Sequence, residues 1–328
     1  IPAEDNYVIN GAVIPTKDLL DEILKLEDEQ TLVQGDMIIA FKEKASEKYL
    51  PYHGKLTIIK NPWDIFVENG AQIRTDLELL KAERTWHKIT DKHTIVYNPD
   101  NVFVEENVKI RAAILNAEDG PIYIGKDTEV NEGAMIRGPF AICEHSIIGM
   151  GAKMRPDTTI GPFSKVAGEI SNSVIFGYSN KGHEGFLGSS VVGEWCNLGA
   201  DTNNSNLKNN YSNVQVYSYK ERKAVNTGRQ FCGLIMGDHA KTGINTMFNT
   251  GTVVGVCANV FGAGFPDKFI PSFSWGGADG IEVYKLEKAL EVAEQVMARR
   301  KISLNDADRS ILSTIFNMDK PAINWIIK

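Results

Sequence analysis

Large aliphatic side chains return at every sixth position along one stretch of this chain. Eight consecutive positions spaced six apart follow the rule: Ile124, Val130, Ile136, Ile142, Ile148, Met154, Ile160 and Val166. If roughly a third of residues were large aliphatics, chance would produce such a run far less than about once in a thousand trials. Small or β-branched residues usually stand four positions later, as at Thr128, Ala134 and Ser146. The repeat is therefore the strongest constraint on the fold.

A period of six matches neither the 3.6-residue turn of an α-helix nor the two-residue alternation of a long strand. It fits a short strand followed by a corner, and three such units close a triangular coil of about eighteen residues. The aliphatic side chain fills the interior, and a following glycine, as in Ile148-Gly149, permits a tight corner. Stacked coils pair their backbones roughly 4.8 Å apart. A β-sandwich would instead show turn signals every 8 to 12 residues or so. The sequence predicts a left-handed parallel β-helix built from hexapeptide repeats.

The same phase can be followed on both sides of this run. It occurs earlier at Val104 and Ile110, before an insertion at 116–121. It returns later at Met236, Thr242, Phe248, Val254 and Val260. Between the blocks, residues 203–234 are irregular and rich in Asn, Tyr and Lys. A loop of that length in a regular prism is uncommon unless it has a function.

The segments that flank the repeat have other patterns. Residues 1–95 combine an amphipathic helix after Thr16 with short apolar runs typical of strands, at 8–9, 37–41 and 56–59. This mixture predicts an α/β domain, or its C-terminal half, over 1–95, and the β-helix is expected over 96–276. The chain starts at Ile1 without a methionine or a signal-peptide pattern, and we expect a first segment to be missing.

Residues 277–328 are expected to be helical. One apolar stripe predicts a helix over 281–301, and a second pattern predicts a helix over 305–316, capped by Asn305 or Ser303. Both helices are expected to cover the open end of the prism or a neighbouring subunit. Membrane binding is the weaker interpretation, because the polar face is mixed in charge rather than basic.

Composition excludes several classes of function. A length of 328 residues suggests about two domains, and a net charge of −7 argues against nucleic acid or an anionic membrane as partner. No apolar run approaches the roughly 20 residues that span a bilayer. The four cysteines lack CxxC spacing and the six histidines form no ligand cluster, so we expect no metal site. Reduced thiols of this kind are typical of a cytoplasmic protein.

The order of motifs along the repeat resembles the C-terminal half of a known family. The stretches that carry the resemblance are Met154-Arg155-Pro156, Lys181-Gly182-His183, Leu187-Gly188, Cys196-Asn197-Leu198-Gly199-Ala200 and residues 203–211, NNSNLKNNY. They resemble GlmU-like bifunctional sugar nucleotidyltransferase/acetyltransferases, and most closely the Bacteroidetes members named glucose-1-phosphate thymidylyltransferase-like. The resemblance covers about residues 100–275, and the segments 8–15 and 61–64 fit the end of that family's nucleotidyltransferase half.

The resemblance implies acyl transfer from acetyl-CoA to a sugar amine, in clefts between the prisms of a homotrimer. His183 matches the position of the family's general base, and an imidazole with a pKa near neutrality suits the removal of a proton from a sugar ammonium. Backbone N–H groups at a prism corner could stabilise the oxyanion. A lone histidine in a Gly-rich corner can also be structural, and His145 and His239, which lack the motif, are expected to be so.

The resemblance also implies substrate-binding residues. Arg155 matches an arginine that holds a phosphate of the sugar substrate, which suits a guanidinium fork, although an exposed corner arginine is an equal alternative. Asn197 and Asn206 match asparagines that position the sugar or the histidine, but asparagine is also common at repeat corners. Lys208 could reach a phosphate, and the alternative is a solvated lysine.

Two departures from the family weaken the inference to glucosamine 1-phosphate. Phe186 stands where the family has a tyrosine after the histidine, and Ser171-Asn172-Ser173 stands where it has a phosphate-contacting lysine. The irregular segment is also longer, with its own basic and aromatic cluster that includes Tyr217, Tyr219 and Lys220. The family's Gly-rich nucleotide loop is not found, so Mg²⁺ is expected only if the nucleotidyltransferase half is complete.

Three functions therefore remain open from the sequence. The first is acyl transfer to an amino-sugar phosphate or nucleotide sugar. The second is a sugar-1-phosphate nucleotidyltransferase that uses UTP or dTTP, with the β-helix serving assembly or regulation. The third is a non-catalytic trimeric scaffold. One fold hosts several functions, so the fold alone does not decide among them.

Overall fold

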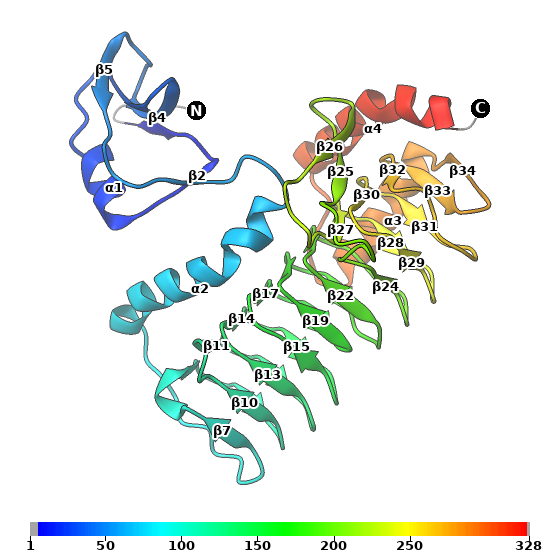
Figure 1. Cartoon of the computed structure of the whole chain (residues 1–328), viewed down its shortest axis with the longest axis horizontal. Coiled ribbons are helices and arrows are strands. Elements are labelled where there is room, and N and C mark those ends of the chain that lie inside the picture. Colours follow the sequence, from blue (N-terminus) through cyan, green and yellow to red (C-terminus); the bar gives the residue numbers. More distant parts are fainter. Residues whose placement is uncertain (1–5, 327–328) are drawn as a thin grey trace. The chain divides into compact units, whose positions relative to one another are not determined.

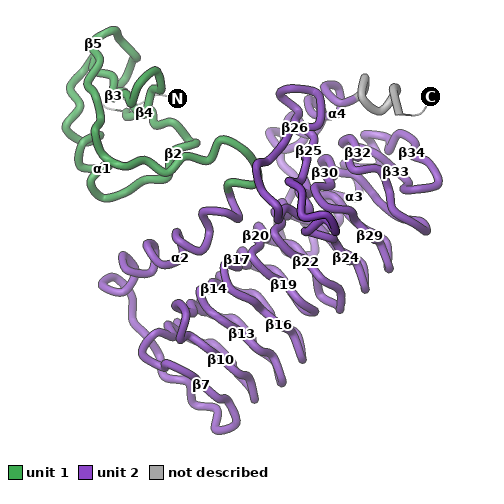
Figure 2. The backbone as a smooth tube through the Cα atoms, viewed as in Figure 1, with its two compact units in different colours: residues 1–64 green, residues 65–328 purple. Residues whose placement is uncertain are grey.

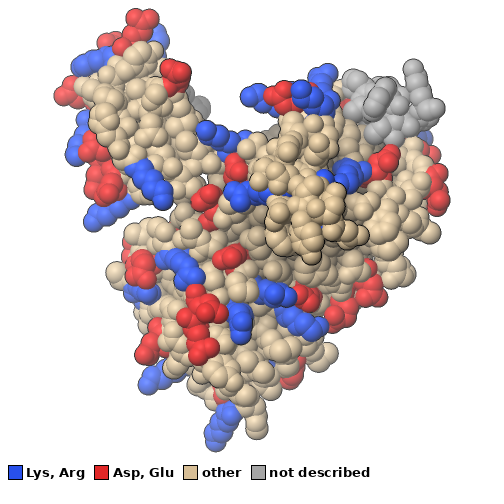
Figure 3. Space-filling view, viewed as in Figure 1, with Lys and Arg blue, Asp and Glu red and all other residues tan. Residues whose placement is uncertain are grey.

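The computed structural model describes residues 6–326, and the chain divides into two compact units, residues 1–64 and 65–328 (Figure 2). Each unit has a hydrophobic core of its own. Figure 3 shows acidic and basic side chains interspersed on the face in view. Within the described range no helix is long and apolar enough to cross a membrane.

The first unit is a small α/β unit. Its elements are β1 (Tyr7–Ile9), β2 (Val13–Ile14), α1 (Lys17–Ile23), β3 (Gln30–Gln34), β4 (Met37–Lys42), β5 (Lys48–Pro51) and β6 (Thr57–Ile58). Four strands form a sheet in the order β1-β4-β3-β5, and β2 pairs with β6. Thr16 caps α1 by accepting a hydrogen bond from Leu19 N, which confirms the predicted helix start. Leu19 and Ile23 of α1 are buried in the core of this unit.

The second unit contains the predicted left-handed β-helix, a stack of triangular coils with three faces (Figure 1). The first face contains β7 (Ile95–Tyr97), β10 (Ile114–Asn116), β13 (Met135–Arg137), β16 (Lys153–Met154), β19 (Glu169–Ser171) and β22 (Phe186–Gly188). The second face contains β8 (Val102–Val104), β11 (Ile122–Ile124), β14 (Phe140–Ile142), β17 (Thr158–Ile160), β20 (Val174–Ile175), β23 (Val191–Val192), β27 (Leu234–Met236), β30 (Thr252–Val254) and β32 (Phe269–Ile270). A short 3₁₀ helix, Pro99–Asn101, joins the first two faces.

The third face contains two runs of strands. They are β9 (Lys109–Ile110), β12 (Glu129–Val130), β15 (Ile147–Ile148), β18 (Lys165–Val166) and β21 (Asn180–Lys181), followed by β28 (Lys241–Thr242), β31 (Asn259–Val260), β33 (Ser274–Gly277) and β34 (Gly280–Val283). Parallel bridges through Asn197 connect the runs. Away from these runs, β24 (Asn203–Asn204) pairs in parallel with β29 (Met247–Phe248). All pairs are parallel except the terminal one, β33 with β34.

The six-residue repeat fills the interior as predicted. The eight aliphatic residues of the repeat run are at most 2% exposed. Neighbouring coils place like residues in register, as in the pairs Val130 with Ile148 and Ile148 with Val166. The earlier and later positions of the phase, from Val104 to Val260, are also buried. Because each inward side chain packs on its counterpart in the next coil, the repeat produces one continuous core.

The corner between the second and third faces carries a column of stacked rings. His145, Phe163, Tyr178, Trp195 and His239 follow one another with centroid separations of 4.6, 5.1, 4.1 and 6.2 Å. All five have a left-handed φ between 56° and 60°. Burial lowers the pKa of His239 to about 4, and its Nδ1 atom is buried with no partner in the described residues. Both histidines are thus parts of the corner column.

The C-terminal helices α3 (Leu286–Ala298) and α4 (Asp306–Ile326) pack against this corner column. Ala289, Ala293 and Met297 of α3 share a buried cluster with Trp195 and Phe273. α3 therefore packs along the side of the prism rather than over its open end, because the rings at the corner offer it an apolar surface. Contact of these helices with a neighbouring subunit stays a prediction. α4 contacts β34, the last strand.

The boundaries of the C-terminal helices differ from the prediction. Residues 281–283 belong to β34, which pairs with β33, so the first helix begins five residues late, at Leu286. The second helix continues ten residues beyond 316, to Ile326. Asn305 caps it by accepting a hydrogen bond from Asp308 N at 2.9 Å, as expected. The apolar stripe did not separate β34 from α3, because Ile281 and Val283 fit both periods.

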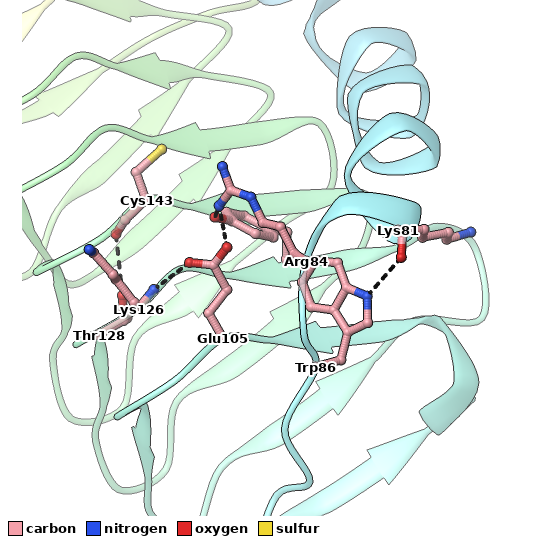
Figure 4. A network of polar contacts seen from close by, with 8 residues as sticks. Lys81, Arg84, Trp86, Glu105, Lys126, Thr128 and Cys143 are labelled. Carbon is pink, nitrogen blue, oxygen red and sulfur yellow. Dashed lines mark hydrogen bonds and ion pairs between the residues drawn. The ribbon is translucent and has the colours of Figure 1, made fainter.

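Helix α2 (Asp64–Glu83) leads into the β-helix and lies beside β11, β14 and β17 in Figure 1. At its end, Arg84 donates to the carboxylate of Glu105 (Figure 4). Arg84 also donates, at 2.9 Å, to the hydroxyl of Tyr123. The other Glu105 oxygen accepts from Lys126 N at 3.0 Å. Trp86 meets the ring of Tyr123 edge to face. This network joins the end of α2 to the first coils.

The irregular segment is only partly a loop. It contains the antiparallel hairpin β25 (Gln215–Ser218) and β26 (Lys223–Asn226). Tyr217 stacks on Phe269 of β32 with a centroid separation of 3.6 Å. The Tyr219 hydroxyl donates to Asp319 of α4 at 3.2 Å. The hairpin is therefore packed on the upper coils and on α4.

Candidate functional site

His183 lies at the corner between the third and first faces, after β21 and before β22. Its side chain is exposed and makes no hydrogen bond within residues 6–326. The backbone N–H groups of Gly182 and His183 are likewise without a partner in this range. Gly185 shapes the turn with a φ of +120°, and a Cβ there would lie 2.2 Å from the carbonyl oxygen of Thr202. The corner therefore presents an imidazole and two free amide donors to solvent.

A buried lysine stands behind this histidine. Lys181 occupies an inward position of β21, next to Val166 in the adjacent coil, and is 1% exposed. Its Nζ donates to the carbonyl oxygen of His183 at 3.0 Å and to that of Ala167 at 3.4 Å. Burial lowers the pKa of Lys181 to about 8. Lys181 thus supports the His183 corner from inside the prism.

Sequence reasoning gave Lys181 no structural role, although a signal was present. After Val166 the inward positions are Ile170, Ile175, Lys181, Leu187, Val192 and Leu198, with spacings shortened to four or five at some corners. Counting sixes from Val166 passes over Lys181. A phase search that allowed shortened corners would have found a lysine in an aliphatic column.

A cleft of about 790 Å³ lies between the third face and the end of α3, and His183 is on its rim. We call it the third-face cleft; its cationic lining residues are Lys165, Lys241, Arg299 and Arg300. Asn180 and Asn197 also line it, and Oδ1 of Asn180 is buried without a partner in the described part of the chain. Burial lowers the pKa of Lys241, whose Nζ donates to the carbonyl oxygen of His239 at 2.8 Å. The cleft thus concentrates positive charge next to His183.

A second cleft, of about 690 Å³, lies where β16, β19 and β22 of the first face end. We call it the first-face cleft; the residues used below are Phe66, Arg155, Phe186, Asn206, Arg229 and Phe231. Arg155 is paired with Glu169 at 3.0 Å. Asn206 donates through Nδ2 to Oγ of Ser189 at 3.3 Å. Arg229 and Phe231 come from the irregular segment and were not singled out in the sequence.

The predicted residues therefore fall into three places. His183 and Asn197 line the third-face cleft, whereas Arg155 and Asn206 line the first-face cleft. Lys208 lines neither of these clefts; its Nζ donates to the carbonyl oxygen of Asn213 at 2.7 Å and so closes a loop. Both departures from the family lie in the first-face cleft, since Phe186 and Ser171 contribute to its lining.

Helix α2 forms one wall of the first-face cleft through a specific docking contact. Asn69 donates through Nδ2 to the carbonyl oxygen of Asp157 at 2.8 Å and accepts at Oδ1 from the Thr159 hydroxyl at 2.8 Å. Gly70 lies so close to Asp157 that a Cβ would meet its Oδ1 at 1.9 Å. These contacts hold Phe66, one turn earlier, at the cleft.

Metal-binding groups and disulfides are not found among the described residues. Across residues 6–326 no group of three or more His, Cys, Asp and Glu side chains is arranged to hold a metal ion. The four cysteines are unpaired. Burial raises the pKa of Cys196 and Cys257 to about 12, so these thiols are neutral near pH 7.

Comparison with known proteins gives one family match and several similar relatives. Residues 1–85 match the family model described as sugar nucleotidyl transferase. A bifunctional sugar-1-phosphate nucleotidylyltransferase/acetyltransferase from Sulfurisphaera tokodaii is 29% identical over 153 residues, which is 44% of this chain and 38% of the relative. The bifunctional protein GlmU of Methanococcus aeolicus is 31% identical over 139 residues, 42% of this chain and 33% of the relative.

A putative uncharacterized acetyltransferase of Escherichia coli K12 is 30% identical over 143 residues, 43% of this chain and 61% of the relative. The chain thus spans about a third of the length of the two bifunctional relatives. The nucleotidyltransferase match, the β-helix and the bifunctional relatives agree with the motif order of the repeat. The chain is thus similar to GlmU-like sugar nucleotidyltransferase/acetyltransferase proteins.

Proposed function

We propose that the β-helix half transfers an acyl group from acetyl-CoA to the amine of an amino-sugar phosphate or nucleotide sugar. The observation that carries the proposal is the setting of His183. It is an exposed histidine without a partner in residues 6–326, on the rim of a cationic cleft, and a short strand separates it from a second cleft that contains arginine and asparagine. Similarity to a bifunctional sugar-1-phosphate nucleotidylyltransferase/acetyltransferase supports the same chemistry.

The proposed reaction needs one base and one oxyanion site. Nε2 or Nδ1 of His183 takes a proton from the sugar ammonium, and the free amine attacks the thioester carbonyl. The carbonyl oxygen becomes an oxyanion, for which the free N–H groups of Gly182 and His183 are available donors. The tetrahedral intermediate then collapses: the C–S bond breaks, the nitrogen releases its remaining extra proton to water, and the amide is left. The departing CoA thiolate takes the proton held by His183.

The third-face cleft is the proposed place of the acyl donor. Coenzyme A carries several phosphate charges, and Lys165, Lys241, Arg299 and Arg300 gather positive charge at this cleft. Asn180 offers a buried acceptor oxygen with no partner in the described residues, which suits an amide N–H of the donor's pantetheine arm. Asn197 lies beside it in register and is available to position His183 or the sugar.

The first test is release of thiol from acetyl-CoA on addition of amino-sugar phosphates and nucleotide amino sugars. His183→Ala is expected to lower kcat by about 100-fold or more, because it removes the general base. The matched control is His93→Ala, an exposed histidine outside both clefts, which should keep full turnover. Full turnover of His183→Ala would contradict the role of this residue. Absence of turnover in the wild type would favour the non-catalytic scaffold.

A second activity, sugar-1-phosphate nucleotidyl transfer, is favoured by the family match over residues 1–85. It would use UTP or dTTP with Mg²⁺ and release pyrophosphate. We assign no Mg²⁺ ligand: residues 6–326 contain no group of three or more His, Cys, Asp and Glu side chains that could hold a metal ion. Pyrophosphate release from a nucleoside triphosphate and a sugar 1-phosphate tests this activity, with the longest natural form of the protein.

We further propose a homotrimer in the cytoplasm. The first three strands of the first face, β7, β10 and β13, expose apolar side chains that lie in register. These are Ile95, Ile114 and Met135, at 50, 37 and 42% exposure. Such a surface suits burial against another prism. Light scattering should give three times the chain mass of 36.3 kDa. Unpaired cysteines fit a reducing compartment.

A further inference from the structure

The first-face cleft contains two guanidinium groups with different surroundings. Arg155 comes from the end of β16 and pairs with Glu169 at 3.0 Å. Arg229 comes from the segment after β26, and its exposed guanidinium makes no ion pair or hydrogen bond within the described range. An arginine that is free of partners at the mouth of a cleft is available to an anionic ligand.

The backbone around Arg229 is held in place, so the position of this arginine is defined. Its N–H donates to the Thr227 hydroxyl at 3.2 Å, and its carbonyl oxygen accepts from Val214 N at 2.8 Å. Three residues later, Cys232 N donates to the carbonyl oxygen of Asn206 at 2.9 Å. A bridge between Leu207 and Phe231 fixes the segment between these contacts. These backbone contacts hold the segment in place as one wall of the cleft.

An exposed aromatic ring stands beside this arginine. Phe231 is 49% exposed although its neighbours Cys232 and Gly233 are buried. Phe186, on the floor of the cleft, is half-buried. A planar base or a sugar face can stack on such rings. Cations together with exposed rings indicate a ligand that combines phosphates with planar or cyclic groups.

We propose that the first-face cleft binds a nucleoside-diphosphate sugar, and that Arg229 distinguishes it from a sugar monophosphate. Arg155 and Arg229 bind the two phosphates, the base stacks on Phe231, and the sugar extends over Phe186 toward His183. Phe186, Leu187 and Gly188 span roughly 10 Å at about 3.3 Å per residue, a length that a diphosphate sugar can bridge. The orientation of the sugar rests on the proposed acyl transfer, but binding itself does not.

The departures from the family agree with this assignment. Ser171-Asn172-Ser173 stands where the resemblance implies a phosphate-contacting lysine, so this stretch carries no positive charge. Arg229 restores a positive charge on another wall of the same cleft. A cleft of about 690 Å³ lies well within the range of ligand sites of roughly 300 to 1,000 Å³.

Calorimetry without any acyl donor tests the proposal, with UDP-glucose, dTDP-glucose and glucose 1-phosphate as probes. At least one nucleotide sugar should bind tenfold or more tightly than glucose 1-phosphate. Arg229→Met should weaken the binding of that nucleotide sugar by tenfold or more and change the affinity for glucose 1-phosphate by less than twofold. The control is Arg222→Met, an exposed arginine between β25 and β26 that does not line the cleft. Equal affinities of all three probes, or no effect of Arg229→Met, would overturn the proposal.

Two further measurements separate this inference from the proposed acyl transfer. Phe231→Ala should weaken the binding of UDP, which carries no sugar, by fivefold or more. Phe231→Tyr keeps the ring and should not weaken it. If Arg229-dependent binding is found but thiol release is absent, the cleft assignment stands and acyl transfer fails. If thiol release from nucleotide amino sugars occurs with a KM unchanged by Arg229→Met, the cleft assignment fails and acyl transfer stands.

Discussion

At the scale of single residues, the unusual feature is an ammonium group inside an aliphatic column. Lys181 stands where neighbouring coils have Val166 and Leu198, and its Nζ contacts backbone carbonyl oxygens, including that of His183. A buried charge of this kind costs stability unless an opposite charge and hydrogen bonds compensate for the lost water. Its contact with the His183 carbonyl suggests that the role is to position the corner.

Replacement of Lys181 by methionine should make stability less dependent on pH. Its folded pKa of about 8 lies below the usual 10.5, so the unfolded chain binds more protons between these values. Stability therefore rises with pH through this window, by on the order of 3 kcal/mol from this residue. Lys181→Met should lose that part of the rise. Urea unfolding at pH 7.5 and pH 9.5 measures it, and an identical rise in both proteins would contradict the assignment.

The same variant tests positioning of His183. Lys181→Met should be as stable as the wild type at pH 7.5, because an apolar chain of similar length suits the column. Its kcat for thiol release should nevertheless fall several-fold, while the KM for acetyl-CoA stays within about twofold. If Lys181 had only a structural role, the pH profile of kcat would be the same in Lys181→Met as in the wild type.

At the scale of elements, the helices define the clefts. The end of α3 forms a wall of the third-face cleft through Arg299 and Arg300, and Arg300 also donates to the carbonyl oxygen of Phe163 at 3.0 Å. The start of α2 contributes Phe66 and Val67 to the first-face cleft. Bare β-helix faces are flat, so each of these clefts exists because a helix or the irregular segment packs on the prism.

Asn69→Ala should undock the start of α2. Asn69 makes two hydrogen bonds of 2.8 Å to Asp157 and Thr159, and their loss leaves partly buried partners unsatisfied. We expect destabilisation of about 1–3 kcal/mol. Thr75→Ala, on an exposed position of the same helix, is the control and should cost less than about 0.5 kcal/mol. Denaturant unfolding measures both, and equal effects would argue against the docking contact.

At the scale of the whole β-helix unit, stability is distributed along the stack. Every coil packs only on its neighbours, so a defect in a middle coil breaks the continuity of the core. Ile147 and Ile148 of β15 are adjacent in sequence but face opposite sides of the wall, and Ile148 is fully buried. They offer a matched pair for testing the repeat.

Ile148→Ala should destabilise the chain by about 2–5 kcal/mol, because it leaves a cavity in the column between Val130 and Val166. Ile147→Ala should cost at most about 1 kcal/mol, because that side chain lines the third-face cleft. Thermal and urea unfolding give both values. A larger cost for Ile147→Ala than for Ile148→Ala would indicate that Ile147, and not Ile148, faces the interior of the prism.

The sequence by itself determined the β-helix, because inward packing is a local rule that repeats with every strand and corner. That rule identified the interior from Val104 to Val166 and again from Met236 to Val260. The rule failed after Val166, where some corners are shortened and inward residues are four or five positions apart instead of six. It therefore passed over Lys181. The sequence pattern also placed Ile281 in a helix, because a short apolar run is compatible with both a helix and a strand.

Only the tertiary structure decided what the outer faces form. The motifs had indicated His183, Arg155, Asn197 and Asn206, but their division between two clefts depends on coil lengths and on where α2 and α3 pack. Arg229 and Phe231 carry no sequence periodicity, and contacts far apart in the chain bring them to the first-face cleft. An interior follows from nearest-neighbour spacing, whereas a binding surface needs elements that are distant in sequence to meet.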